Sequence, residues 1–285
     1  MSDTRGSAED PHRIFTVCGG TDVGSKRADN QDAFVIADLS SGVVSCPCAR
    51  TEVSVTRPGM LVVVCDGMGG RPAGDVAAQV AASTVKDELT VAGAAVVEAP
   101  GHALETAVEG ANRAILETVR AHPEDKGMGT TCTAAVFGPD HAAFAQVGDS
   151  RAYLLRGGRL QLLTRDQTMA AELVDAGALR PEQVAHFPYR HVLLQALGNS
   201  GGVQPVITDL ALEEGDRVLL CSDGLHGPVP DDAIAAILRA SGDPFEATRA
   251  LVSAALAAGG PDNVTAVVTD CGRLETTAPR QPTAR

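Results

Sequence analysis

Short apolar runs bounded by turn residues alternate along the chain with Ala-rich segments whose apolar positions recur at i, i+3 and i+4. The short runs predict buried strands, and the Ala-rich segments predict helices with one apolar face. The predicted strands are residues 13–17, 33–37, 60–65, 131–137, 142–147, 151–155, 159–163, 217–221 and 264–269. The predicted helices are residues 74–89, 102–121, 231–240 and 245–258.

The predicted elements come in blocks rather than in strict strand–helix alternation. Two long helices part the early strands from a strand-rich middle, and two more precede the final strand. This order favours mostly antiparallel sheets with helices packed outside, an α+β arrangement in one domain. We expect that domain to span residues 13–273. Residues 1–12 and 274–285 are polar and aperiodic, which predicts a loose N-terminus and a loose C-terminal tail.

Two stretches interrupt the regular pattern. Residues 40–59 are rich in Ser, Thr, Gly and Pro, which predicts a loop or a ragged hairpin. Cys46-Pro47-Cys48 within it is interpreted as plain loop thiols, because a closed zinc site needs four ligands and no partner motif is visible. Residues 166–198 combine a helix-like AAELVDAG with two prolines. Packing structure and a mobile flap over a site are equally compatible with this second stretch.

Composition and charge argue against several classes of protein. Of the 285 residues 44% are hydrophobic, which supplies a core and rules out wholesale disorder. The formal charge of -13 repels phosphate backbones, and aromatic residues at 3% offer few platforms for stacking on bases. No apolar run is long enough for a membrane span, and no signal peptide is visible. We expect a cytoplasmic protein with reduced cysteines and neither a nucleic acid nor a membrane as partner.

Acidic residues stand at the ends of several predicted strands. Asp66 and Asp223 follow apolar runs in VVVCDG and VLLCSDG. Asp149 follows another run in FAQVGDSR, and Asp262 precedes one in GGPDNVTAVV. Each motif alone is an ordinary turn. If the strands lie in facing sheets, however, their ends bring the carboxylates into one cleft, where like charges require cations. The set indicates a Mg²⁺ or Mn²⁺ site, to which glycine at position 67 gives backbone access.

One basic residue stands close to a further acidic motif near the start of the chain. Arg27 precedes Asn30-Gln31-Asp32 at the mouth of a predicted strand. Arginine suits forked recognition of phosphate oxygens. A surface arginine paired with Asp29 or Asp32 is the alternative, and taken alone the motif favours it.

The motifs, taken in chain order, resemble those of the PPM family, the type 2C metal-dependent serine/threonine protein phosphatases. They are R-x-x-N-Q-D, D-G-M-G-G, G-T-T, G-D-S-R, S-D-G and P-D-N, running from Arg27 to Asn263. The short D-G-M-G-G form resembles the bacterial branch. The resemblance implies a four-layer α-β-β-α sandwich, with two mostly antiparallel sheets flanked by helices. It also implies a centre of two Mn²⁺ or Mg²⁺ ions at one end of the sandwich.

The resemblance assigns metal ligands residue by residue. Asp66 would bridge both ions, and the carbonyl of Gly67 would bind one of them. Asp223 and Asp262 would hold the other ion. Asp149 matches a residue that, with the counterpart of Asp223, holds a third ion in bacterial relatives.

The remaining matches concern the reaction. Arg27 would bind the substrate phosphate, and Asp32 would act mainly through metal-bound water. The two implied cations would lower the pKa of a coordinated water, so that water could attack phosphorus in line and no phosphoenzyme would be needed. The chain departs from many relatives at Met68, where eukaryotic members carry a His proposed to donate a proton. It also carries Gln31 for Glu and Gln167 for His, but none of these changes removes a direct metal ligand.

The expected function is therefore metal-dependent hydrolysis of phosphoserine and phosphothreonine on proteins, by a monomer. A serine/threonine kinase or its targets would suit as substrates. The alternative is a catalytically silent regulator that binds phosphoproteins on the same fold. Retention of Asp66, Asp223 and Asp262 favours the enzyme, because a silent copy has no need of all three.

Overall fold

The computed structural model describes residues 11–42, 51–69 and 73–276. One of its two sheets has the strand order β3-β1-β12-β11-β8-β9. Neighbouring strands in this sheet are antiparallel throughout. Its strands are β1 (Pro11–Asp22), β3 (Thr51–Val55), β8 (Arg151–Arg156), β9 (Arg159–Leu162), β11 (Arg217–Cys221) and β12 (Val264–Thr276).

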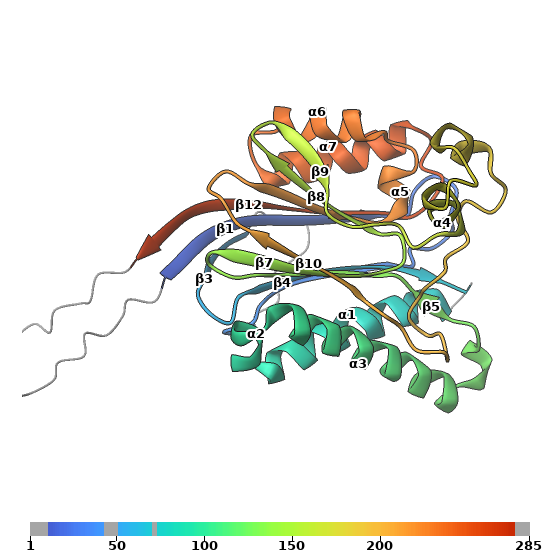
Figure 1. Ribbon diagram of the computed structural model, residues 1–285, viewed down its shortest axis with the longest axis horizontal. Coiled ribbons are helices and arrows are strands. Elements are labelled where there is room, and N and C mark those ends of the chain that lie inside the picture. The colour runs from blue at the N-terminus through green and yellow to red at the C-terminus, as the bar shows by residue number, and fades with distance from the viewer. Residues whose placement is uncertain (1–10, 43–50, 70–72, 277–285) are drawn as a thin grey trace, which may run out of the picture.

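The other sheet has the order β10-β7-β6-β4-β2 and is also antiparallel at every pairing. Its strands are β2 (Asp32–Asp38), β4 (Met60–Met68), β6 (Cys132–Phe137), β7 (His141–Val147) and β10 (Val206–Ala211). A short strand, β5 (Gly129–Thr130), pairs only with the end of β4. The two sheets lie face to face (Figure 1).

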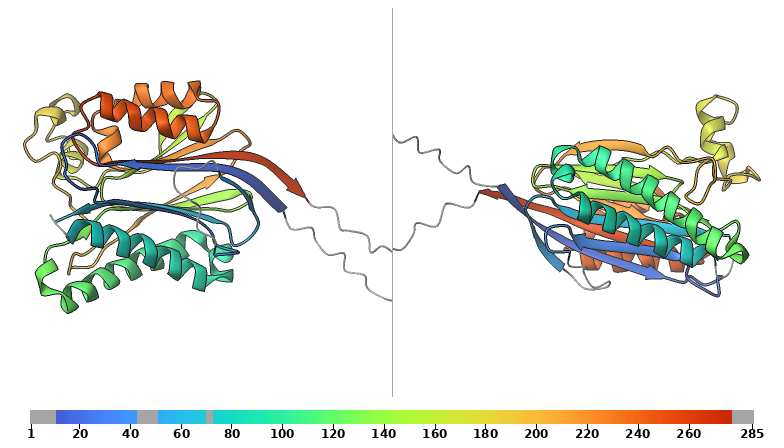
Figure 2. Two further views of the ribbon diagram at one scale, coloured as in Figure 1. Left: turned by 180° about the vertical axis from the view of Figure 1, so that it is seen from behind. Right: turned by 90° about the horizontal axis from the view of Figure 1, so that it is seen from below.

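Helices cover the outer face of each sheet, which completes four layers (Figures 1 and 2). The sheet containing β4 is covered by α1 (Ala73–Ala92), α2 (Ala94–Glu98) and α3 (Pro100–Ala121). The sheet containing β12 is covered by α5 (Asp223–His226), α6 (Asp231–Ala240) and α7 (Pro244–Ala257). The connections also contain η1 (Pro123–Asp125), α4 (Met169–Asp175) and η2 (Pro181–His186). None of the helices in the described ranges is long and apolar enough to cross a membrane. The expected α-β-β-α sandwich is thereby confirmed.

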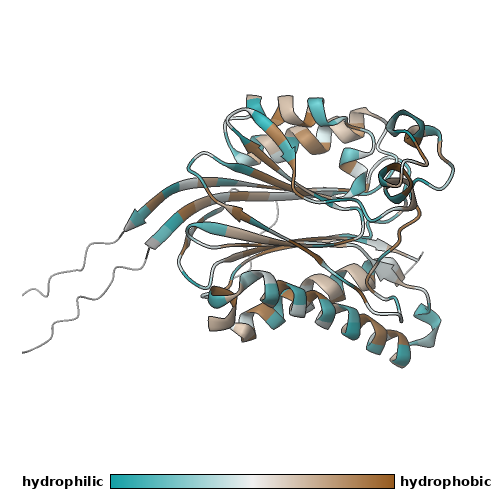
Figure 3. Cartoon of the chain, viewed as in Figure 1, coloured by the Kyte–Doolittle hydropathy of each residue, from teal (hydrophilic) through white to brown (hydrophobic). Residues whose placement is uncertain are grey.

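Three apolar clusters fill the three spaces between the four layers (Figure 3). The run LVVVC of strand β4 contains no polar residue. Leu61 and Val63 face the helices α1 and α3, whereas Val62 and Val64 face the opposite sheet. A strand buried on both faces carries no polar alternation. Packing on both faces therefore holds β4 in place and fixes the position of the residues at its end.

The predicted helices and strands are all present, with ends that differ by a few residues. Three strands and two short α-helices were missed: β3, β5, β10, α2 and α5. β3 corrects the reading of residues 40–59 as a loop or hairpin, because Thr51–Val55 pairs with β1. Residues 43–50, with Cys46 and Cys48, lie outside the described residues. The described cysteines are buried thiols, as expected.

Strands β1 and β12 also extend farther than predicted. Pro11 pairs with Thr276 and His12 with Glu275, so residues 11–12 and 274–276 form a ribbon rather than loose ends. These strand ends project at one end of the sandwich (Figure 1). The ends of β4, β7 and β11, and the starts of β2 and β12, lie at the opposite end.

Candidate active site

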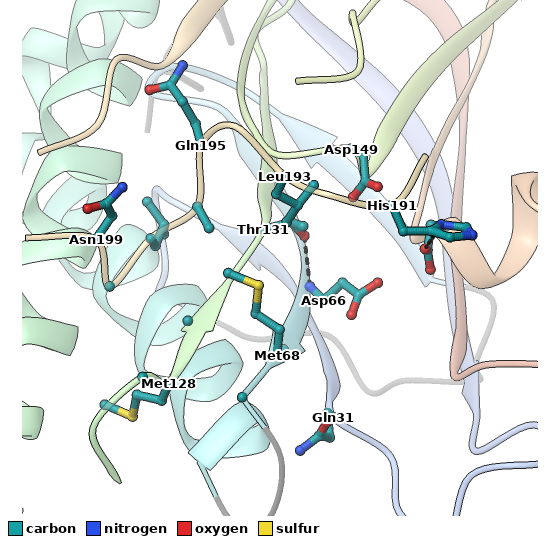
Figure 4. A pocket seen from close by; sticks show the side chains of 18 of the residues that line it. Gln31, Asp66, Met68, Met128, Thr131, Asp149, His191, Leu193, Gln195 and Asn199 are labelled. Atoms are coloured by element: carbon teal, nitrogen blue, oxygen red, sulfur yellow. Dashed lines mark hydrogen bonds and ion pairs between the residues drawn. The ribbon is translucent and has the colours of Figure 1, made fainter. Parts of the chain in front are cut away.

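The predicted site residues meet at a cavity of about 780 Å³ at this second end of the sandwich. Arg27, Asp66, Gly67, Asp149, Asp223 and Asp262 all line it. Asp32 does not line it but pairs with Asp66 across β2 and β4. Figure 4 shows Asp66, Asp149 and His191 around one space, with Met68 and Met128 on another side of the cavity. Side chains from widely separated motifs are thus brought together, as expected.

The G-T-T motif holds the backbone of Asp66. The amide of Asp66 donates to Thr131 Oγ1 at 2.9 Å, the contact dashed in Figure 4. The carbonyl of Asp66 accepts from Thr130 Oγ1 and from the Thr131 amide, both at 2.9 Å. Thr131 Oγ1 in turn lies 2.7 Å from Ser150 Oγ of the G-D-S-R motif. Hydroxyl residues are needed at these positions because they fix the strand end that carries Asp66.

Glycine in the two Asp-Gly motifs is required by close backbone contacts rather than by turns. A Cβ on Gly67 would lie 2.1 Å from the carbonyl oxygen of Gly74. A Cβ on Gly224 would lie 1.8 Å from the carbonyl oxygen of Asn263. Asp66-Gly67 lies within β4, and Asp223 begins α5, so the reading of either pair as an ordinary turn is wrong. These glycines let the strand ends approach closely enough to form one site.

Two further motifs that line the cavity are joined to each other by hydrogen bonds. Arg27 Nη2 donates to Asp262 Oδ2 at 2.7 Å, and the Arg27 side chain is 53% exposed. Asn263 Oδ1 accepts from the Gln31 amide at 2.8 Å, and its Nδ2 donates to the carbonyls of Val23 and Asp29. Asn263 was quoted in P-D-N without a role. It fastens the loop carrying Arg27 to the strand that follows Asp262.

The carboxylates raise one another's pKa values. Burial is the first cause of the raised pKa of Asp66, followed by the charges of Asp32 and Asp223. Burial, opposed by two hydroxyl hydrogen bonds, raises the pKa of Asp32 to about 7. Burial and the charge of Asp223 likewise raise the pKa of Asp149 to about 7. The site therefore resists holding all its negative charge at neutral pH without a counter-charge.

The donor atoms fit divalent cations. Asp32 Oδ1 and Asp223 Oδ1 are buried without a hydrogen-bond partner among the described residues. Buried anionic oxygens are costly unless paired or coordinated to a metal. Across the described ranges no three His, Cys, Asp or Glu side chains are already gathered around one point, so the fit rests on these oxygens and on the mutual repulsion. Carboxylate and carbonyl oxygens are the ligands preferred by Mg²⁺ and Mn²⁺.

Within residues 166–198, left open between packing structure and flap, residue 191 and residues 193–198 line the cavity. The Gln167 amide donates to the Gly148 carbonyl, and the Gly148 amide donates to Gln167 Oε1. At the other end of the stretch, Leu197 and Thr130 exchange backbone hydrogen bonds. His191 of this segment lines the cavity, with Nδ1 4.0 Å from Asp223 Oδ2. No role was assigned to His191 from the sequence; its only signal is the nearness of His186 and Arg190.

The raised pKa values make the stability of the metal-free protein depend on pH. An unfolded Asp loses its proton near pH 3.8, whereas folded Asp149 keeps it until about 7. The stability that this group contributes is therefore present at acid pH and is lost as the pH rises through about 7. Thermal unfolding in chelator at about pH 5 and about pH 8 should show a smaller loss of stability for Asp149→Asn than for wild type. Parallel losses in the two proteins would contradict the raised pKa.

A sandwich with this strand order and an aspartate-rich cavity at one end agrees with the expected family. A family model described as protein phosphatase 2C matches residues 25–258, and the chain belongs to this family. The resemblance based on the motifs is confirmed.

Relatives with similar sequences are bacterial serine/threonine phosphatases. The chain is 40% identical over 224 residues to the serine/threonine protein phosphatase PstP of Mycobacterium tuberculosis, covering 78% of this chain and 42% of that relative. The match thus spans less than half the length of PstP. The serine/threonine phosphatase stp of Listeria monocytogenes is 33% identical over 211 residues, covering 74% of this chain and 84% of the relative.

Solved structures share the fold. The crystal structure of the Mycobacterium tuberculosis phosphatase PstP/Ppp superposes with a TM-score of 0.76 at 35% identity, covering 91% of this chain and 100% of that one. The catalytic domain of PstP in complex with two manganese ions superposes with a TM-score of 0.74 at 33% identity, covering 92% and 100%.

Proposed function

We propose that this chain is a metal-dependent phosphatase that removes phosphate from phosphoserine and phosphothreonine side chains of proteins. The observation that carries the proposal is the meeting of Asp66, Asp223 and Asp262 with Arg27 at one cavity. The names of the relatives and the manganese ions of one structural neighbour support it.

The ligand assignments follow the motifs. Asp66, the Gly67 carbonyl, Asp223 and Asp262 would hold two ions, Mn²⁺ or Mg²⁺. Asp149, with Asp223, would hold a third ion. When bound, such cations lower the pKa of a coordinated water and neutralise charge on phosphoryl oxygens.

Other residues of the chain would orient the reactants. Arg27 would bind the phosphate, because its side chain is half exposed and lines the same cavity as its partner Asp262. Asp32 retains one carboxylate oxygen without a hydrogen-bond donor among the described residues, so Oδ1 is available to accept a proton. Met68 lines the cavity but has no proton to donate. A catalytic proton must come from another group in the cavity.

The size and lining of the cavity favour a protein substrate. A volume of about 780 Å³ exceeds what one phosphorylated side chain needs. Apolar residues, including the half-exposed Met68 and Leu194, line it beside the aspartates. An apolar wall of this kind suits the side chains that flank the phosphorylated residue of a protein substrate. We propose that the chain acts in the cytoplasm as a monomer, on a serine/threonine kinase or its targets.

Removal of Arg27 should weaken substrate binding. Loss of a charge-assisted hydrogen bond to phosphate costs about 1.5 kcal/mol or more, so Arg27→Ala should raise KM for a phosphothreonine peptide about tenfold with a smaller change in kcat. Arg27→Lys should restore part of the loss, since the charge is kept but the fork is not. Arg249→Ala, an exposed arginine on α7, is the matched control. An unchanged kcat/KM in Arg27→Ala would assign Arg27 to the pair with Asp262 alone.

Release of inorganic phosphate from a phosphothreonine peptide in Mn²⁺ tests the proposed function. If the chain is a phosphatase, we expect catalytic turnover of the peptide. Binding of the peptide without phosphate release, with Mn²⁺ bound to the protein, would favour the silent regulator instead.

A further inference from the structure

The two oxygens of the Asp32 carboxylate have different surroundings. Oδ2 accepts hydrogen bonds from Ser222 Oγ and Thr265 Oγ1, both at 2.7 Å. Ser222 and Thr265 are 0% exposed, so water does not compete for these contacts. Oδ1 is buried and accepts no hydrogen bond from the described residues. Oδ2 is thus fixed by two hydrogen bonds, and Oδ1 remains able to accept a hydrogen bond or a proton.

When Asp32 is ionised, the hydrogens in this group have only one consistent arrangement. An ionised carboxylate only accepts, so Ser222 and Thr265 must both donate to Asp32. Because a hydroxyl carries a single hydrogen, Thr265 Oγ1 must accept in its 2.8 Å contact with Thr21 Oγ1. Thr21 therefore donates to Thr265, and it accepts from Asn30 Nδ2 at 2.8 Å. The Asp32 amide donates to Asn30 Oδ1 at 3.1 Å, which fixes the orientation of the Asn30 amide.

The second donor is fixed in the same way. Ser222 Oγ accepts from the Thr265 amide at 3.0 Å, so its one hydrogen is free to point at Asp32. The Ser222 amide donates to the Thr265 carbonyl at 3.1 Å. The ends of β11 and β12 therefore present both hydroxyls to Asp32 from a rigid backbone pair.

We propose that Thr265 and Ser222 are positioning residues that hold Asp32 by Oδ2 and leave Oδ1 to serve the reaction, and that Thr21 and Asn30 orient Thr265. This inference rests on the proposed phosphatase function. Without these hydroxyls the Asp32 carboxylate gains rotational freedom and Oδ1 loses its fixed place. None of these four residues lines the cavity with Asp66, so none is in a position to contact the bound substrate directly. The effect should therefore fall on kcat rather than on KM.

The strand that carries Thr265 also provides a matched control. Thr269 lies four residues farther along β12, is 1% exposed, and its Oγ1 has no hydrogen-bond partner among the described residues. Thr265→Val and Thr269→Val make the same isosteric change at buried sites of one strand. Only the first removes a hydrogen bond to Asp32.

The test measures kcat and KM on a phosphothreonine peptide at saturating Mn²⁺, Mn²⁺ affinity by calorimetry, and Tm. A hydrogen bond to a charged group corresponds to a loss of about tenfold to a hundredfold, so Thr265→Val and Ser222→Ala should each lower kcat by about tenfold or more. KM should change less than about twofold. Thr265→Ser should recover most of the loss because it keeps the hydroxyl, and Thr269→Val should match wild type.

The outcomes separate this inference from the proposed function. Absence of turnover in wild type would overturn the function itself. With an active wild type, an unchanged kcat in folded, Mn²⁺-bound Thr265→Val and Ser222→Ala would overturn the positioning role. A fall in Mn²⁺ affinity that accounts for the whole loss would overturn it also. If Thr265→Val does not fold, the exposed Thr21→Val decides: we expect a loss of about threefold in kcat, and no loss would overturn the chain of donors.

Discussion

Asp66→Asn is expected to lower kcat on a phosphothreonine peptide by about a thousandfold or more while leaving the chain folded. Divalent cations contribute several kcal/mol to such reactions, and about 1.4 kcal/mol corresponds to each factor of ten. Asp66 is the carboxylate on which the charges of Asp32, Asp223, Asp149 and Asp262 all act. Its neutral amide would bind cations poorly and would also relieve that repulsion. The metal-free variant should therefore unfold at a higher temperature than metal-free wild type.

Two measurements are needed for this variant, the rate of phosphate release and thermal unfolding in chelator. Asp209→Asn is the matched control, since Asp209 is an exposed carboxylate on β10 outside the cavity lining. It should match wild type in both. Near-normal kcat in Asp66→Asn with metal bound would contradict the assignment of Asp66. A lower Tm of the metal-free variant would contradict the repulsion argument alone.

Asp149→Ala is expected to cost much more with a phosphothreonine peptide than with p-nitrophenyl phosphate. A threonine alkoxide leaves poorly without a proton, whereas nitrophenolate leaves well, and help from a general acid is typically worth about 10²–10⁴-fold. Met68 has no proton to give. Asp149 lines the cavity and, with Asp223, would hold the third ion. A water on that ion would be the candidate source of the proton that the poor leaving group needs.

The comparison requires saturating Mn²⁺ and equal metal content in variant and wild type. Equal losses on both substrates would make Asp149 a general contributor to metal or phosphate binding. No loss on either substrate would mean that Asp149 takes no part in the reaction. The role of the G-D-S-R motif would then be the contact of Ser150 with Thr131.

The sequence predicted most of the core and both long helix pairs because these segments have strong periodicity. The edge strand β10 was missed because its residues are half exposed or exposed, which blurs the contrast that marks a strand. β3 was missed for another reason: its Ser and Thr suggested a loop, although TEVSV alternates and buries Val53 and Val55. Alternation was the stronger signal there, and composition the weaker one.

The sequence predicted which acidic residues belong to the candidate site, and the structure shows which contacts hold them in place. The strand-end position of Asp66 and Asp223 followed from apolar runs that the sequence displays. The contacts of Thr265 with Asp32, and of Asn263 with the loop of Arg27, join residues more than 230 positions apart. No local pattern reveals such pairs, because they arise only when the ends of β2, β11 and β12 meet.

Phosphate release from a phosphothreonine peptide is expected to depend on divalent cations bound at these aspartates. The most direct measurement strips the protein with chelator, then follows both bound Mn²⁺ and phosphate release as Mn²⁺ is returned. We expect no release from the stripped protein, recovery as Mn²⁺ binds, and weaker Mn²⁺ binding with no recovery in Asp66→Asn. Robust phosphate release in excess chelator would contradict metal-dependent catalysis at these aspartates.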